Sequence, residues 1–340
     1  MDASNDSPGG ADIPAGGKFE HVSFMVKDLR EAAQDFNDIF GIHWILMRND
    51  HLGQYLGASD NGLVLSQEID PENPTTAILY EKYLTAIEVK VPDLDLYHQK
   101  VQALGATPYL EMHSIGGFHE FIYDKDSFHQ FPLVVNSYPS DSLLESTGSE
   151  TPEGHSNVVW NWFPGHSGWN AKGQDYSRLS DVISGTGDCH VVRVALFVPS
   201  NFERVVDDFT RGFDMEFTVV TSTKLGLRIA LSDQGYQFCE TLDASTPSPL
   251  VQNFGENLVA AVEIRGKDMD EVDTRLLAKG VKKICEFRCQ WGYRAYYYDS
   301  SAFHNIPLLI AESVQQGFLQ AIQPGLAQNP QNCGVDIKWS

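Results

Sequence analysis

Apolar and polar residues alternate along short stretches of this chain, in an order that recurs four times. Residues 19–26 alternate with the period of two that is typical of a strand. A stretch with helical spacing follows at residues 29–40, and Gly41 closes it. Three further strand-like stretches come next, at residues 43–48, 53–57 and 62–68. The pattern therefore predicts a βαβββ unit, with one strand, one helix and three more strands.

The same order begins again at Leu84, Val191 and Leu258, so we predict four units in one chain. The strongest internal match joins the second and fourth units. Residues 117–133 align without gaps on residues 292–308, and Gly, Tyr-Asp, Phe-His and Pro-Leu coincide in register. A match of this length, at the same place in the order of elements, indicates an internal duplication.

The segment between the second and third units lacks sustained periodicity. Residues 137–187 are rich in Ser, Pro, Gly and Trp. We interpret them either as an inter-domain linker with its aromatic side chains held on the surface, or as a lid over a pocket. The predicted organisation is a disordered leader at 1–17, an N-terminal domain at 18–136, the linker or lid at 137–187, a C-terminal domain at 188–312 and a tail at 313–340.

The order of elements and two sequence stretches resemble the vicinal oxygen chelate superfamily of glyoxalases, bleomycin-resistance proteins and extradiol dioxygenases. Residues 19–29, Phe-Glu-His-Val-Ser-Phe-Met-Val-Lys-Asp-Leu, resemble the start of such a domain, and residues 88–94 resemble the start of its second half. The resemblance covers about residues 18–136 and 190–312. It implies an α+β fold in which four βαβββ units pair into two open-barrel, glyoxalase-like domains, each enclosing a cup.

The resemblance also implies a divalent metal in the cup, held by two His (or Gln) side chains and by acids. His21 matches the first ligand position. The other positions hold residues of different kinds, namely Leu84 or Thr85 and Pro132 in the N-terminal half, and Arg193, Val259 and Pro307 in the C-terminal half. Proline and aliphatic side chains do not bind metals, so we predict no metal and no cofactor. Iron, manganese, zinc or nickel bound through His21 is the alternative.

The ionisable side chains that remain favour acid–base chemistry. A neutral imidazole transfers protons near pH 7, and a desolvated carboxyl can act as a base. The candidate catalytic residues are His21, His119, Glu68, Glu120 and His129. His21 could equally be a structural histidine. His129 and His304 share a Phe-His-x-x-Pro context, which predicts a turn in which the imidazole binds backbone groups.

Two further sets of residues repeat between the halves. Glu88 and Glu263 occupy matching strand positions, either as solvated acids or as a base in the cup wall. The candidate substrate-binding residues of the C-terminal half are Trp291, Tyr293, Arg294, Tyr296 and Arg193. Two arginines could hold an anion there. The alternative is an inactive second cup that is filled by Tyr296 and by Arg–Glu pairs.

The composition narrows the set of partners. With 46 acidic and 24 basic residues, the net charge is -22, which disfavours nucleic acids and anionic membranes. The five cysteines form no CxxC pair and suit a reducing cytoplasm. Two complete cups within one chain need no partner subunit, so we expect either a monomer or a homodimer that binds a small molecule.

The sequence thus predicts a cytoplasmic enzyme of the vicinal oxygen chelate type. It would act on a small oxygenated compound, aromatic ones included, by lyase or isomerase chemistry. Two alternatives remain open. One is a resistance-type protein that sequesters its ligand, and the other is a metal-dependent extradiol dioxygenase.

Overall fold

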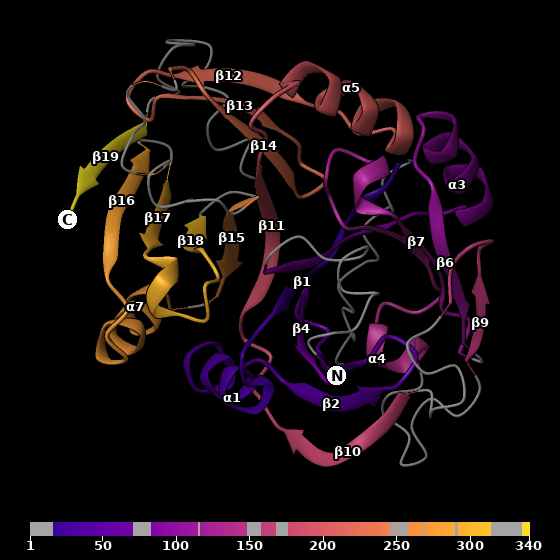
Figure 1. Ribbon diagram of the computed structural model, residues 1–340. Helices are drawn as coiled ribbons and strands as arrows, with labels where there is room; N and C mark the ends of the chain where they lie inside the picture. Colours follow the sequence, from indigo (N-terminus) through magenta and orange to yellow (C-terminus); the bar gives the residue numbers. More distant parts are fainter. Residues whose placement is uncertain are drawn as a thin grey trace, which may run out of the picture.

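Two curled mixed sheets with few helices form the protein, which is therefore α+β as predicted (Figure 1). The computed structural model describes residues 16–70, 83–114, 116–147, 158–167, 176–243, 245, 250, 258–266, 268–289, 292–313 and 335–340. Nearly all of the predicted leader and most of the predicted tail lie outside these residues. No helix among them is long and apolar enough to cross a bilayer.

The N-terminal sheet combines the first two units. The first unit comprises β1 (Lys18–Met25), α1 (Leu29–Phe40), β2 (Trp44–Asn49), β3 (Gln54–Ala58) and β4 (Leu63–Glu68). The second comprises β5 (Leu84–Lys90), α3 (Leu94–Ala103), β6 (Pro108–His113), β7 (His119–Tyr123), the 3-10 turn η1 (Lys125–Ser127) and β8 (Leu133–Ser137). Antiparallel pairing of β1 with β5 joins the units at the centre of a sheet in the order β10-β2-β3-β4-β1-β5-β8-β7-β6-β9.

The C-terminal sheet repeats this plan. Its third unit comprises β11 (His190–Phe197), α5 (Phe202–Phe213), β12 (Thr218–Ser222), β13 (Leu227–Leu231) and β14 (Tyr236–Thr241). Its fourth comprises β15 (Val259–Arg265), α7 (Met269–Ala278), β16 (Lys283–Cys289), β17 (Tyr293–Tyr298), η2 (Ser300–Ala302) and β18 (Leu308–Ser313). The pair β11–β15 takes the place of β1–β5, with the same bulges in its register.

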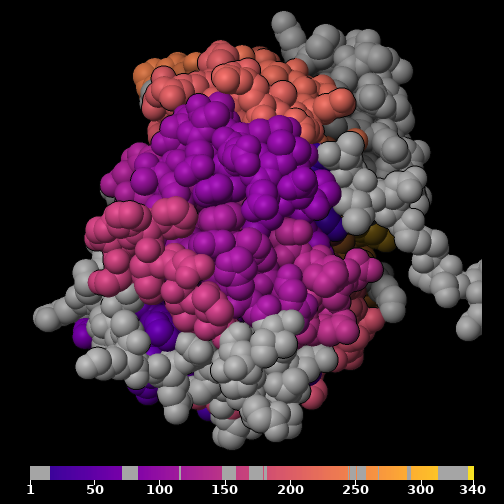
Figure 2. Space-filling model, turned by 90° about the vertical axis from the view of Figure 1, so that its right-hand side faces the viewer, coloured from indigo at the N-terminus to yellow at the C-terminus, as the bar shows by residue number. Residues whose placement is uncertain are grey.

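The segment between the domains adds elements to the N-terminal sheet. It contains α4 (Leu143–Ser146), β9 (Val159–Trp162) and β10 (Tyr176–Ile183). Strand β9 pairs with β6 at one edge, and β10 pairs with β2 at the other. Figure 2 shows the side where the pink residues of this segment lie against the purple second unit. In the other sheet, β19 (Val335–Trp339) pairs with β16, the counterpart of β6.

Local chemistry explains where the helices begin and end. An aspartate caps the N-terminus of α1, α3 and α7, where Asp28, Asp93 and Asp268 each accept a hydrogen bond from a backbone N–H of the first turn. Gly41 ends α1 with φ of 68°, a left-handed conformation that glycine adopts without strain. Gly41 is the helix end that the sequence pattern predicts.

The two domains share a core and a pair of equivalent contacts. Helix α3 packs on α5, and α1 packs on α7. His129 Nε2 lies 2.9 Å from Asp208 Oδ2 on α5, and His304 Nε2 lies 3.1 Å from Asp35 Oδ2 on α1. Each imidazole thus binds a carboxylate of the other domain. The prediction that these histidines bind backbone groups was wrong, because a turn motif seen in isolation does not show what packs on it.

Candidate active site in the N-terminal cup

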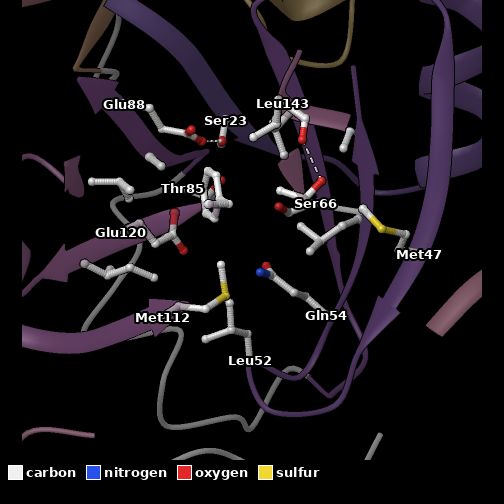
Figure 3. A pocket seen from close by; sticks show the side chains of 18 of the residues that line it. Ser23, Met47, Leu52, Gln54, Ser66, Thr85, Glu88, Met112, Glu120 and Leu143 are labelled. Atoms are coloured by element: carbon white, nitrogen blue, oxygen red, sulfur yellow. Dashed lines mark hydrogen bonds between the residues drawn. The ribbon is translucent and has the colours of Figure 1, made fainter. Parts of the chain in front are cut away.

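The N-terminal sheet curls around a cavity of about 120 Å³ (Figure 3). Most of its wall is apolar, with Met47, Leu52, Leu56, Met112, Ile122 and Val134 among the lining residues. Eight polar side chains share the wall: Ser23, Gln54, Ser66, Thr85, Glu88, Ser114, Glu120 and Thr147. Leu143 and Thr147, on α4 and directly after it, also line the cavity. An apolar cavity with a few convergent polar groups is the usual form of a small-molecule site.

Strand alternation decides which side chains face this cavity. On β1, Val22 and Phe24 are buried in the core between sheet and helices, whereas Ser23 lines the cavity. On β7, Glu120 and Ile122 line the cavity. Alternation along the strands therefore puts the polar, cavity-lining side chains on one face of the sheet and the core side chains on the other.

Glu88 of β5 is held by several polar groups. Ser23 Oγ donates a hydrogen bond to its Oε1 at 3.1 Å, and Asn136 Nδ2 donates to its Oε2 at 3.3 Å. His21 Nδ1 lies 3.8 Å from Oε2. Burial raises the pKa of Glu88, while His21 and the Ser23 hydroxyl oppose that rise. Its raised pKa makes the Glu88 carboxylate a stronger base than an ordinary carboxylate, and the hydrogen bonds from Ser23 and Asn136 stabilise its ionised form.

Glu120 of β7 has a different environment. It is 8% exposed, and no hydrogen-bond partner for its carboxyl occurs among the described residues. Burial raises its pKa well above the ordinary value, and the nearby charge of Glu88 adds to that rise. In Figure 3 its carboxyl points into the cavity, between Thr85 and Met112. Glu120 thus retains its proton at a pH where an ordinary carboxyl has lost it.

His21 is buried beside the cavity rather than in its lining. Its Nε2 lies 2.9 Å from the Ser59 carbonyl oxygen, which can only accept, so Nε2 carries the proton and donates. Nδ1 is then the atom that faces Glu88. With Nε2 donating to the backbone, His21 has no N–H left for Glu88, so the geometry places it behind that carboxyl as a buried residue that does not reach the cavity.

The other predicted catalytic residues lie elsewhere. His119 is on the outer face of β7, 3.0 Å from Glu111 Oε1, and does not line the cavity. Glu68 is half-buried at the end of β4, in register with Gln54. His129 is at the domain contact with Asp208.

The sequence indicates Glu88 only as one of two interpretations of a repeated acid, and Thr85 only as a residue at a metal-ligand position. It does not single out Gln54 or Ser66. The available signal was their polarity at inward positions of otherwise apolar strands. The Thr85 hydroxyl is buried without a hydrogen-bond partner in the described part of the chain. It is therefore free to bind a ligand group in the cavity.

The predicted substrate-binding residues of the second domain are bonded to acids or buried. Arg193 Nη1 donates to Glu263 Oε2 at 2.9 Å, with both side chains buried. Arg294 Nη2 lies 2.9 Å from Asp270 Oδ1, to which the Tyr296 hydroxyl also donates, at 3.1 Å. Tyr293 is buried. Trp291 lies outside the described residues. The Arg193–Glu263 contact favours the alternative of an inactive second cup. The prediction that Tyr296 fills this cup was wrong, because Tyr296 packs in the core on the helix side of the sheet and bonds Asp270 of α7.

We asked whether the first cup suits the divalent metal that is typical of this fold. Within the described residues, the cup brings no three His, Cys, Asp or Glu ligand atoms within 4.8 Å of one another. His21 Nε2 is committed to a backbone carbonyl. The cup residues therefore do not fit the usual ligand set.

Comparison with known proteins shows the fold. No family model and no curated protein sequence matches the chain. A variant of 4-hydroxymandelate synthase from Streptomyces coelicolor superposes with a TM-score of 0.55 at 12% identity, over 91% of this chain and 99% of that one. A Mn(II)-bound glyoxalase from Novosphingobium aromaticivorans gives a TM-score of 0.51 at 14% identity, over 88% and 84% of the two chains.

A third solved structure, a xylose isomerase-like TIM barrel/4-hydroxyphenylpyruvate dioxygenase fusion protein, has a TM-score of 0.55 at 12% identity. It is matched over 95% of this chain and 55% of its own length. The chain therefore has the vicinal oxygen chelate fold, as the sequence resemblance predicted. At these identities the likeness shows the architecture alone.

Proposed function

We propose that the protein is an enzyme that moves protons on a small oxygenated substrate in the N-terminal cup, as a lyase or isomerase. The observation that supports this proposal most directly is the pair of buried carboxyls, Glu88 and Glu120, in one apolar cavity. Pairs of acids with different environments take the two roles of base and acid in many enzymes.

The contacts assign a role to each carboxyl. Glu88 accepts hydrogen bonds from Ser23 and Asn136, which stabilise its ionised form, so it is the base that removes a proton from carbon. Glu120 retains its proton and donates it to a carbonyl or leaving hydroxyl oxygen of the substrate. After one turnover Glu88 is protonated and Glu120 is ionised, and proton exchange restores the pair. The two groups titrate together because each charge disfavours the other.

The cavity also limits the substrate. Its volume of about 120 Å³ is similar to that of an engineered cavity of about 150 Å³ that holds benzene, so one ring or its equivalent fits. No lysine or arginine is among the described residues that line it, and two acids are. A carboxylate or phosphate group would be repelled. We therefore propose an uncharged compound with neighbouring oxygens, including hydroxylated aromatics and hydroxy ketones.

The experiment is a turnover screen by NMR on a panel of such compounds, with wild type, Glu88→Gln and Glu120→Gln. Glu203→Gln, at an exposed carboxylate on α5, is the matched control. We expect consumption of at least one compound by wild type and by the control, with both cup variants strongly impaired. Equal turnover in all four proteins would overturn the proposed roles.

The same samples separate the other two functions. Tight binding without any turnover, unaffected by Glu120→Gln, would favour a sequestering protein. Oxygen uptake in proportion to substrate consumed would favour a dioxygenase, a reaction class to which the fold alone gives comparable support. We also propose that the enzyme works as a monomer or homodimer, with the small-molecule substrate as its partner.

A further inference from the structure

A second cluster of ionisable side chains lies on the outer face of the N-terminal sheet, away from the cup. Glu111 and His113 project from the same face of β6, two residues apart. His119 of β7 is the cross-strand partner of His113. The next residue, Glu120, lines the cavity on the opposite face. The cluster is therefore separate from the proposed catalytic pair.

The three side chains converge on one point. Glu111 Oε1 lies 2.7 Å from His113 Nε2 and 3.0 Å from His119 Nε2, and the two imidazole centroids are 3.7 Å apart. Among the described residues, only this group places three His, Cys, Asp or Glu ligand atoms within 4.8 Å of one another. Two rings compete for a single carboxylate oxygen, which is an arrangement that a shared cation would replace.

A neighbouring strand orients the carboxylate. Asn161 Nδ2 of β9 donates to Glu111 Oε2 at 3.2 Å and leaves Oε1 for the imidazoles. Hydrogen bonds that orient a metal-binding side chain in this way are common in metal sites. The side chains of His113, Glu111 and His119 are 36%, 23% and 26% exposed, so water reaches the cluster.

The protonation states suit ligands. Burial and the adjacent His113 lower the pKa of His119, which keeps that ring neutral near pH 7. Although burial opposes it, hydrogen bonds from Asn161 and the histidines lower the pKa of Glu111, which keeps that carboxyl ionised. Neutral imidazole and carboxylate are the forms that bind divalent transition metals.

We propose that Glu111, His113 and His119 bind one divalent transition metal ion of the zinc type, with water in the fourth position. Zinc bonds of about 2.0 to 2.1 Å place tetrahedral donors about 3.3 Å apart, so the side chains need to open by a few tenths of an ångström. The ion would join β6 to β7 and, through Asn161, to the added strand β9. The ion would thus cross-link strands at the edge of the sheet whose inner face forms the cup. This inference stands independently of the proposed reaction.

The test is calorimetric titration of the full chain with Zn²⁺, after chelator treatment and dialysis, in a buffer that does not bind metals. We expect one site per chain with a micromolar or lower Kd. His113→Gln, His119→Gln and Glu111→Gln should each weaken binding at least tenfold. His43→Gln, at a half-buried histidine on the other side of the sheet order, is the matched control and should bind as wild type does. Circular dichroism checks that each variant is folded.

Three outcomes would overturn the site. The first is no binding tighter than millimolar in wild type, and the second is unchanged Zn²⁺ affinity in all three ligand variants. The third is loss of the ion in Glu88→Gln or Glu120→Gln with the outer variants unaffected, which would place the metal in the cup. If Zn²⁺ raises the midpoint of thermal unfolding in wild type and in His43→Gln but not in His119→Gln, the result would support the proposed cross-link between strands.

Discussion

The two cups of this chain have the same strands but opposite interiors. Strand register matches the polar cup residues Ser23, Gln54, Ser66, Thr85, Glu120 and Asn136 with Ala195, Leu227, Cys239, Ala260, Ala295 and Ala311 of the second cup. Only the acid of the central strand is shared, as Glu88 and Glu263. In the first cup it faces a cavity, and in the second an arginine neutralises it.

The surroundings of this shared acid indicate which cup is suited to catalysis. A buried acid with an ion-pair partner is part of the packing, whereas a buried acid with an open cavity beside it is an unstable arrangement that needs a functional reason. Tyr297, the counterpart of Ile122, donates its hydroxyl proton to the Ala260 carbonyl and fills space in the second cup. We therefore infer that the proposed chemistry belongs to the first cup and that the second is closed by packing.

The largest expected effect separates the cups by activity. Removing the proton of Glu120 as Glu120→Gln should lower kcat by about 100- to 10,000-fold, the usual contribution of a general acid. The amide keeps the shape of the side chain, so substrate binding should persist. Steady-state kinetics on a compound from the screen, with a binding isotherm by calorimetry, measures both quantities.

The second-cup counterpart provides the control. Glu263→Gln should leave kcat unchanged at a temperature where the variant is folded, because its carboxyl faces Arg193 and not the substrate. A loss of turnover in Glu263→Gln as large as that in Glu120→Gln would contradict the assignment of one active cup.

The next effect separates the cups by stability. Glu263→Ala removes the buried carboxylate that Arg193 and Arg265 share and leaves the buried Arg193 charge uncompensated by it, which should lower the free energy of unfolding by about 3 to 5 kcal/mol. Glu88→Gln in the first cup should cost much less, since no arginine or lysine depends on that carboxyl. Urea unfolding followed by circular dichroism measures the two values.

A rescue variant sharpens this test. Replacing the two buried members of the cluster, as Arg193→Met with Glu263→Leu, should recover most of the loss, because an apolar pair of similar volume needs no desolvation, while Arg265 is 25% exposed and can turn to water. If the double variant is as unstable as Glu263→Ala, the loss reflects packing rather than the unpaired charge.

The elements of both domains could be predicted from local pattern. The helix expected at residues 29–40 is Leu29–Phe40, and the strand expected at 19–26 is Lys18–Met25. Period-two alternation, aspartate caps and glycine stops are signals carried by neighbouring residues. They survive folding because the tertiary structure reinforces them.

The site could be predicted only in part. Alternation separates His119 from Glu120 but does not say which face of β7 is inside the curl, and chemical expectation favoured the histidine. For Glu88, repeated as Glu263, the sequence leaves a solvated acid and a base in the cup wall as alternatives, because strand position alone does not show what faces the carboxyl. The useful signal was the reverse: an acid in one copy and Ala295 in the other marks a position that only one cup needs.

A smaller effect appears in the pH dependence of stability. The folded state holds the Glu120 proton to higher pH than the unfolded chain, whose carboxyl titrates near pH 4.3. The native state therefore binds more protons above that pH, and wild-type stability falls as pH rises through the window up to the folded pKa. Glu120→Gln has no proton to lose, so its stability relative to wild type should rise from pH 4 to pH 8.

The size of this change in relative stability follows from linkage and is about 1.4 kcal/mol for each unit by which the folded and unfolded pKa values of Glu120 differ. Glu286→Gln provides a control of opposite sign. Although burial opposes it, Arg288 and Arg294 lower the pKa of Glu286, so this variant should lose stability relative to wild type as pH rises from 3 to 7. Parallel trends in the two variants would contradict the burial of an uncompensated acid in the first cup.

The smallest effect tests where the two domains remain equivalent. His129→Ala and His304→Ala each remove one imidazole–carboxylate contact between domains and should each cost about 1 to 2 kcal/mol in urea unfolding. Burial lowers the pKa of His129 despite Asp208, so the native state binds fewer protons than the unfolded chain below about pH 6.5. Wild-type stability from this group is then lost as pH falls, and the deficit of His129→Ala should shrink between pH 7.5 and pH 5. Equal deficits for the two variants at pH 7.5 would show that the interface is energetically symmetric although the two cups differ, and a deficit in only one would show that the interface is asymmetric as well.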